Sequence, residues 1–92
     1  MKLPVGITEL PAASFAQGEV VIKEGSQQEK LYFLESGRVE VVRDGTRIAL
    51  IRTPGSVLGE ISFLLGTETT ADVIAAEDSV LRVAEDPMAF LL

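Results

Sequence analysis

The chain has 92 residues, 8 basic and 14 acidic side chains, a net charge of −6, and neither cysteine nor histidine. This length makes one small domain, residues 1–92, and the missing residue types exclude disulfides, thiol nucleophiles, histidine-bound metals and the commonest general base. Because these residue types are missing, we expect a non-enzymatic protein. The acidic balance argues against direct nucleic-acid binding. No apolar run approaches the ~20 residues that cross a bilayer, so we expect no membrane segment.

Residues 1–14 are predicted to form an N-terminal arm. The segment carries two prolines and a glycine, and it shows no sustained hydrophobic periodicity. Ile7 and Leu10, followed by Phe15, are the apolar residues expected to pin the arm to the body. The first residues have neither the basic start nor the apolar core of a signal peptide, so we expect a cytoplasmic location.

The middle of the chain is predicted to be a succession of short strands separated by turns. Residues 31–35 are almost continuously apolar, so both faces of that strand should be covered. In the next strand Val39 and Val41 point to one side, and Asp44-Gly45 then predicts a type I′ hairpin. The predicted strands are 19–24, 31–35, 38–43, 47–52, 70–76 and 79–84. Their length and spacing predict a mainly β fold, a double-stranded β-helix or jelly-roll barrel.

The last residues are predicted to begin a helix. Asp86 suits the N-cap and Pro87 the first helical position, and the residues that follow are mostly apolar. We interpret 86–92 as the start of a truncated C-terminal helix. The chain is therefore expected to be a fragment, or to have lost a C-terminal element.

The alternation of the strands stops within residues 55–72, where Gly59 and Glu60 open a short predicted helix. Gly59 lets a ligand approach the backbone, and the amides of Ile61 and Ser62 would be free to bind an anion. Because the Glu60 carboxylate would repel that anion, it either accepts a hydrogen bond from a hydroxyl such as a ribose 2′-OH, or caps the helix. From these residues alone, the capping role is favoured.

Three segments, taken in order, resemble the cyclic-nucleotide-binding domain family. Residues 15–25, FAQGEVVIKEG, are similar to its opening strand and first corner, and residues 31–41, LYFLESGRVEV, to its most recognisable hairpin. Residues 59–62, GEIS, resemble the start of its phosphate-binding cassette. The resemblance covers residues 15–92. It implies a barrel with a short cassette helix, a possible cAMP or cGMP ligand, and an effector domain or second subunit as partner.

The cassette departs from the family at the arginine that pairs with the cyclic phosphate. Thr69 stands at that position, while Thr70 and Ala71 fit the small positions after it. A charge-assisted contact to phosphate contributes about 1.5–3 kcal/mol, and Glu68 adds a negative charge nearby. The resemblance therefore implies a regulatory ligand-sensing module with weak or absent cAMP and cGMP binding. Its candidate ligand-binding residues are Gly59, Glu60, Ile61, Ser62, Thr69, Thr70 and Ala71, with no catalytic residue, metal or cofactor.

Two alternatives stay open. The first is a functional cAMP or cGMP sensor that binds through Glu60, the same two cassette amides and Thr70. The second is a jelly-roll enzyme, which the lack of histidine and cysteine disfavours. Arg52 or Arg82 could supply the missing positive charge, but no spacing places either in the site, and both are interpreted as solvated strand-face charges.

Overall fold

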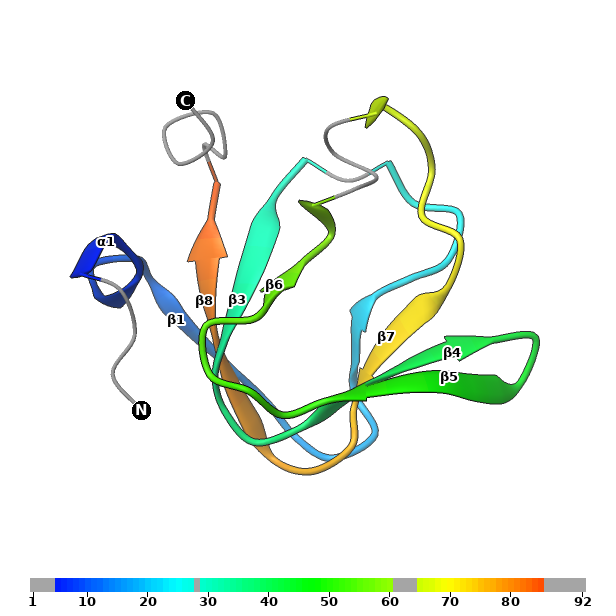
Figure 1. The fold of residues 1–92 in the computed structure, drawn as a ribbon, viewed down its shortest axis with the longest axis horizontal. Coiled ribbons are helices and arrows are strands. Elements are labelled where there is room, and N and C mark those ends of the chain that lie inside the picture. Colours follow the sequence, from blue (N-terminus) through cyan, green and yellow to red (C-terminus); the bar gives the residue numbers. More distant parts are fainter. Residues whose placement is uncertain (1–4, 28, 61–64, 86–92) are drawn as a thin grey trace.

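The computed structural model describes residues 5–27, 29–60 and 65–85. The strands form two antiparallel four-stranded sheets, a first sheet with the order β1-β8-β3-β6 and a second with the order β2-β7-β4-β5 (Figure 1). The elements are α1 (Val5–Thr8), β1 (Ala12–Phe15), β2 (Val20–Ile22), β3 (Leu31–Ser36), β4 (Val39–Arg43), β5 (Thr46–Ile51), β6 (Val57–Leu58), β7 (Asp72–Ala75) and β8 (Ser79–Ala84). This architecture confirms the predicted mainly β fold.

The main core lies between the two sheets, and strand β3 contributes to two clusters. Leu34 packs in the cluster that joins the sheets, whereas Leu31 and Phe33 pack in a second cluster with Ile7 of α1. Both faces of β3 are thus covered, as the apolar run predicted. The main cluster is Ile22, Leu34, Val39, Leu58, Val73 and Leu81.

Residues 12–15, of which 12–14 belong to the predicted N-terminal arm, form strand β1. The strand pairs antiparallel with β8, with Ala12 opposite Arg82 and Phe15 opposite Ser79. Its residues alternate between exposed and half-buried. Three of its four side chains are small, so the sequence shows too little hydrophobic pattern to indicate a strand, and the strand exists through its pairing. The sequence therefore contained no indication of this strand within the predicted N-terminal arm.

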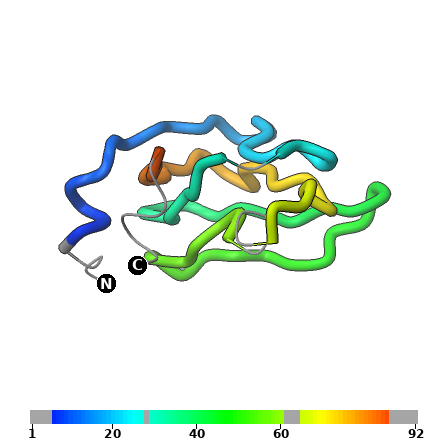
Figure 2. The backbone as a smooth tube through the Cα atoms, turned by 90° about the horizontal axis from the view of Figure 1, so that it is seen from above, coloured from blue at the N-terminus to red at the C-terminus, as the bar shows by residue number. Residues whose placement is uncertain are grey.

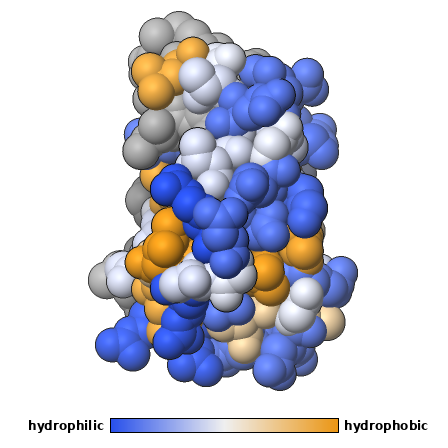
Figure 3. Space-filling model, turned by 90° about the vertical axis from the view of Figure 1, so that its right-hand side faces the viewer, coloured by the Kyte–Doolittle hydropathy of each residue, from blue (hydrophilic) through white to orange (hydrophobic). Residues whose placement is uncertain are grey.

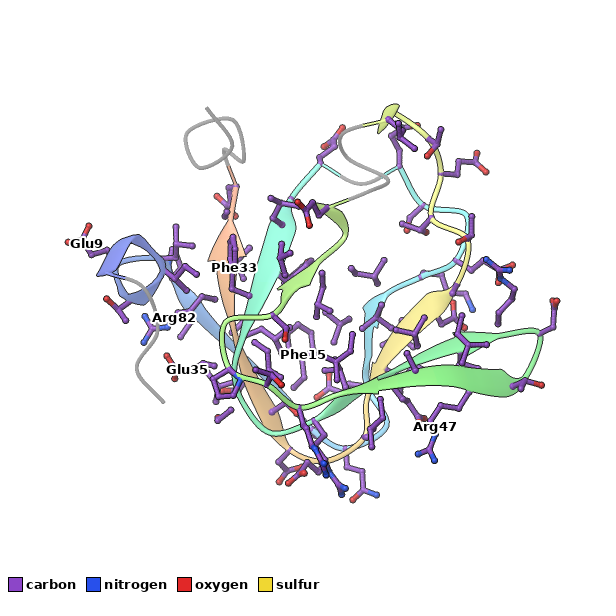
Figure 4. The ribbon with its side chains drawn as sticks, in the orientation of Figure 1. Glu9, Phe15, Phe33, Glu35, Arg47 and Arg82 are labelled. Carbon is purple, nitrogen blue, oxygen red and sulfur yellow. The ribbon has the colours of Figure 1, made fainter. Side chains whose placement is uncertain are left out.

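Arg82 of β8 holds α1 in place. Its Nε donates to Glu35 Oε1 at 2.6 Å, and its guanidinium also donates to the carbonyl oxygens of Thr8 and Leu10, at 3.0 and 2.8 Å. Figure 4 shows the Arg82 and Glu35 side chains close together beside α1. Arg82 is therefore a partly buried anchor, and its interpretation as a solvated charge was wrong.

The hairpin between β4 and β5 has the predicted turn. Asp44 and Gly45 have φ values of 52° and 77°, and positive values at both positions are what a type I′ turn requires. Val39 is buried and Val41 packs against the main cluster, which confirms their shared inward face. Seen from above in Figure 2, this hairpin and α1 lie at opposite ends of the molecule.

Strand β5 is the outer edge of the second sheet and is exposed along most of its length. The register shifts between Val41 and Val42, which leaves Ile48 without a partner in β4 and 56% exposed. Figure 3 views the molecule from the hairpin side, where hydrophilic side chains surround separate apolar patches. Among the described residues, no helix has the length and apolar character needed to cross a membrane.

Candidate functional site

A cavity of about 280 Å³ lies between the two sheets, where β6 faces the second sheet. The strand residues that line it, here called the walls, are apolar, and the residues outside the strands that line it, here called the rim, include the polar groups. The walls are Ile22 of β2, Val41 of β4, Ile51 of β5, Val57 and Leu58 of β6, and Val73 of β7. The rim is Gly59, Glu60, Thr69, Thr70 and Ala71. The cavity therefore combines an apolar interior with a polar edge, as ligand sites usually do.

The structure brings five of the seven predicted site residues together around this cavity. Ile61 and Ser62, with most of the predicted cassette helix, lie outside the described residues, as does the predicted C-terminal helix. The apolar walls were not predicted from the sequence. The alternation that turned Val41 inward was the one local signal for them. The ligand-binding role of all these residues stays a prediction.

Strand β6 fixes the position of Glu60. Its two residues pair with β3, with Leu58 opposite Tyr32 and Val57 opposite Phe33. Gly59 follows at once with a φ of 88°, a conformation that glycine adopts without strain. Glu60 is half-buried, and no described residue forms an ion pair or hydrogen bond with its carboxylate. Its oxygens are thus open to a ligand donor on the described side of the cavity.

Thr69, which occupies the position of the expected arginine, is bonded to the corner that follows β2. Its side chain is only 7% exposed. The hydroxyl donates to the carbonyl oxygen of Lys23 at 2.7 Å and accepts from the Ser26 amide at 3.2 Å. In the backbone, the Gly25 amide donates to the Thr69 carbonyl at 2.7 Å, and the Thr69 amide donates to the Ser26 carbonyl at 2.9 Å. Thr69 is therefore a structural residue of this corner as well as part of the cavity rim.

Further contacts join the same corner, residues 23–27, to the segment before and within β7. Gln27 forms a β-bridge with Glu68, and its side-chain nitrogen donates to the Gly66 carbonyl at 3.3 Å. The Glu24 amide donates to Asp72 Oδ1 at 2.7 Å. Residues 66–72 are therefore joined to this corner by hydrogen bonds within the chain.

The described part of the cavity offers no positive charge. Glu60 is the one ionisable side chain among the described lining residues, so neither Arg52 nor Arg82 replaces the missing arginine there. The described residues also contain no group of three carboxylates suited to holding a metal ion. The cavity is consequently apolar and locally negative.

We expect Thr69→Val to lower the free energy of unfolding by about 1–2 kcal/mol. The substitution keeps the shape of the side chain but removes the hydroxyl that joins Lys23 and Ser26. Urea denaturation followed by circular dichroism measures the change. The matched control is Thr70→Val at the exposed neighbour, which should change stability by less than about 0.5 kcal/mol. Equal effects at the two positions would contradict the structural role of Thr69.

Comparison with known proteins gives a consistent family. The family model described as "Cyclic nucleotide-binding domain" matches residues 12–87. Acetyltransferase Pat of Mycolicibacterium smegmatis is 40% identical over 73 residues, which cover 76% of this chain and 22% of that protein. A cAMP-dependent protein kinase regulatory subunit of Yarrowia lipolytica is 34% identical over 64 residues, which cover 70% of this chain and 17% of that protein.

A solved structure shares the fold over most of the chain. It is the regulatory subunit of a cAMP-independent protein kinase A from Trypanosoma cruzi, bound to guanosine. The TM-score is 0.78 at 30% sequence identity, and the match covers 88% of this chain and 31% of that one. The family model spans all strands from β1 to β8 together with the cavity between them. These matches confirm the resemblance seen in the sequence: the chain belongs to the cyclic nucleotide-binding domain family.

Proposed function

We propose that the domain is a non-enzymatic regulatory module whose binding of cAMP and cGMP is weak or absent. The observation that supports this most is Thr69, which replaces the cassette arginine and whose hydroxyl is bonded to Lys23 and Ser26. A cyclic phosphate that leaves water for this cavity meets no cation on its described walls. Burying an anion without a charged partner is costly, so the loss of the arginine weakens binding directly.

The output of the module is proposed to come from an effector domain or a second subunit. The chain spans only 22% and 17% of two curated relatives, an acetyltransferase and a kinase regulatory subunit. The domain itself is proposed not to bind nucleic acid, because its net charge of −6 is repelled by phosphates. A cytoplasmic location remains a prediction from the sequence.

Calorimetric titration with cAMP and with cGMP tests the proposal. We expect no dissociation constant below roughly 10–100 µM, since the missing contact costs one to two orders of magnitude in affinity. A submicromolar dissociation constant that Glu60→Ala abolishes would instead establish the functional sensor.

The matched control for that experiment is Glu9→Ala. It makes the same change of charge at an exposed carboxylate that points away from the cavity (Figure 4). An equal effect of both substitutions would show that net charge, and not the cavity, controls binding.

A further inference from the structure

The charge distribution around the cavity favours a ligand without a phosphate, an inference that rests on the proposed function above. Two basic side chains contact residues 70–72, next to the cavity. The Lys23 ammonium lies 3.6 Å from Asp72 Oδ2, and Arg43 Nε donates to the Thr70 carbonyl at 3.1 Å. Neither side chain lines the cavity, and Lys23 is already paired with a carboxylate. The charge that a ligand meets on the described walls is therefore that of Glu60 alone.

Repulsion from Glu60 separates anionic ligands from neutral ones. A carboxylate and a phosphodiester in one small cavity repel each other, and partial burial weakens the screening by water. A neutral ligand avoids that repulsion and keeps whatever contacts its other groups make. The same cavity should therefore bind an uncharged ligand more tightly than the same ligand carrying a phosphate.

The polar groups of the rim define what the neutral ligand must present. An ionised carboxylate only accepts hydrogen bonds, and its two oxygens suit a pair of neighbouring hydroxyl donors. The exposed Thr70, which also lines the cavity, carries a hydroxyl that can donate or accept. A ligand with a vicinal diol satisfies Glu60 fully, whereas a ligand with one hydroxyl satisfies half of it.

The walls and the volume restrict the rest of the ligand. Ile22, Val41 and Val73 give an aliphatic surface that suits a flat, weakly polar ring. The volume of about 280 Å³ is at the small end of the roughly 300–1,000 Å³ typical of ligand cavities. A diol joined to a heterocycle of modest size, with no phosphate, is the chemistry that fits all of these features.

We propose that the cavity takes an uncharged nucleoside in preference to the corresponding cyclic nucleotide. The ribose hydroxyls bind the Glu60 carboxylate, and the base lies against the aliphatic wall. This proposal explains both features of the site. Glu60 is retained because it recognises the sugar, and the cassette arginine is absent because the ligand has no phosphate.

The test is calorimetric titration of the full chain with adenosine, guanosine, cAMP and cGMP in one buffer. We expect at least one nucleoside to bind ten or more times tighter than its cyclic nucleotide, and its 2′-deoxy form to bind several times more weakly. If each cyclic nucleotide binds as tightly as its nucleoside, the inference is wrong. If that binding is also submicromolar, the proposed function fails with it.

The remaining outcome separates the two proposals. Absence of nucleoside binding at millimolar concentration overturns this inference, whereas weak or absent cyclic nucleotide binding leaves the proposed function intact. Glu60→Gln supplies a second readout, because it removes the repulsion of phosphate and one favourable acceptor together. We expect it to reduce the preference for nucleoside over cyclic nucleotide by at least fivefold, with no such change in the control Glu9→Gln. An unchanged preference would overturn the role given to Glu60.

Discussion

Replacing Gly37 with alanine is expected to lower the free energy of unfolding by about 3 kcal/mol. Gly37 joins β3 to β4 with a φ of 92°, where an added Cβ would lie 2.7 Å from the Asp78 carbonyl oxygen and from the Ser79 Cα. Positive φ costs a residue with a side chain about 1–2 kcal/mol, and forced overpacking adds about 1–3 kcal/mol. The neighbours cannot easily move away, because Ser79 is only 3% exposed and its hydroxyl bonds both the amide and the carbonyl of Arg38.

Thermal unfolding measures this effect. A loss of 3 kcal/mol in a domain of this size should lower Tm by roughly 12–24 °C. Gly45→Ala is the matched control, since its φ is also positive, at 77°, but an added Cβ there meets nothing within 4 Å. In the control, the free energy of unfolding should fall only by the cost of a positive φ at alanine, about 1–2 kcal/mol. A similar loss in both variants would show that the clash with Asp78 and Ser79 does not matter.

Replacing Thr69 with arginine is expected to raise the affinity for cAMP about 10- to 100-fold. Thr69 is part of the cavity rim, so a longer side chain at this position can bring a guanidinium to the phosphate. The same change removes the hydroxyl bonds to Lys23 and Ser26, which should cost about 1–2 kcal/mol of stability. The variant is therefore expected to bind better while unfolding more easily.

Titration calorimetry measures the affinity for cAMP, and urea denaturation measures the free energy of unfolding. Thr69→Gln is the control, because it also replaces the hydroxyl with a longer polar side chain but carries no charge. If glutamine gives the same gain in affinity, the positive charge is not its cause. If arginine gives no gain, the missing cassette arginine is not what limits cAMP binding.

Much of the second sheet could be predicted because its signals are local. The Asp44-Gly45 turn and the inward face of Val39 and Val41 depend on neighbours a few residues away, and both predictions were confirmed. Strand β1 could not be predicted, since its four residues take their conformation from β8 near the far end of the described chain. Local pattern carries no information about such a partner.

The candidate site divides in the same way. The pattern of residues 55–72 predicted Gly59, Glu60, Thr69 and Thr70 as site residues, and the structure places them around one cavity. The bonding of Thr69 was not predictable, because its partners Ser26 and Lys23 lie 43 and 46 positions earlier in the chain. The sequence showed that an arginine was replaced, whereas the structure shows what the replacement holds together.

The strand order also has a consequence for the chain during synthesis. All four strands of the second sheet precede residue 76, whereas the first sheet places β8, the last of the described strands to emerge, between β1 and β3. A nascent chain that has not passed residue 84 can pair the second sheet but leaves β1 without a partner. Because non-local pairing is slow and exposed strand edges invite aggregation, this interval is the vulnerable one. The delay before β8 leaves the ribosome is therefore the interval in which this domain is most exposed to misfolding.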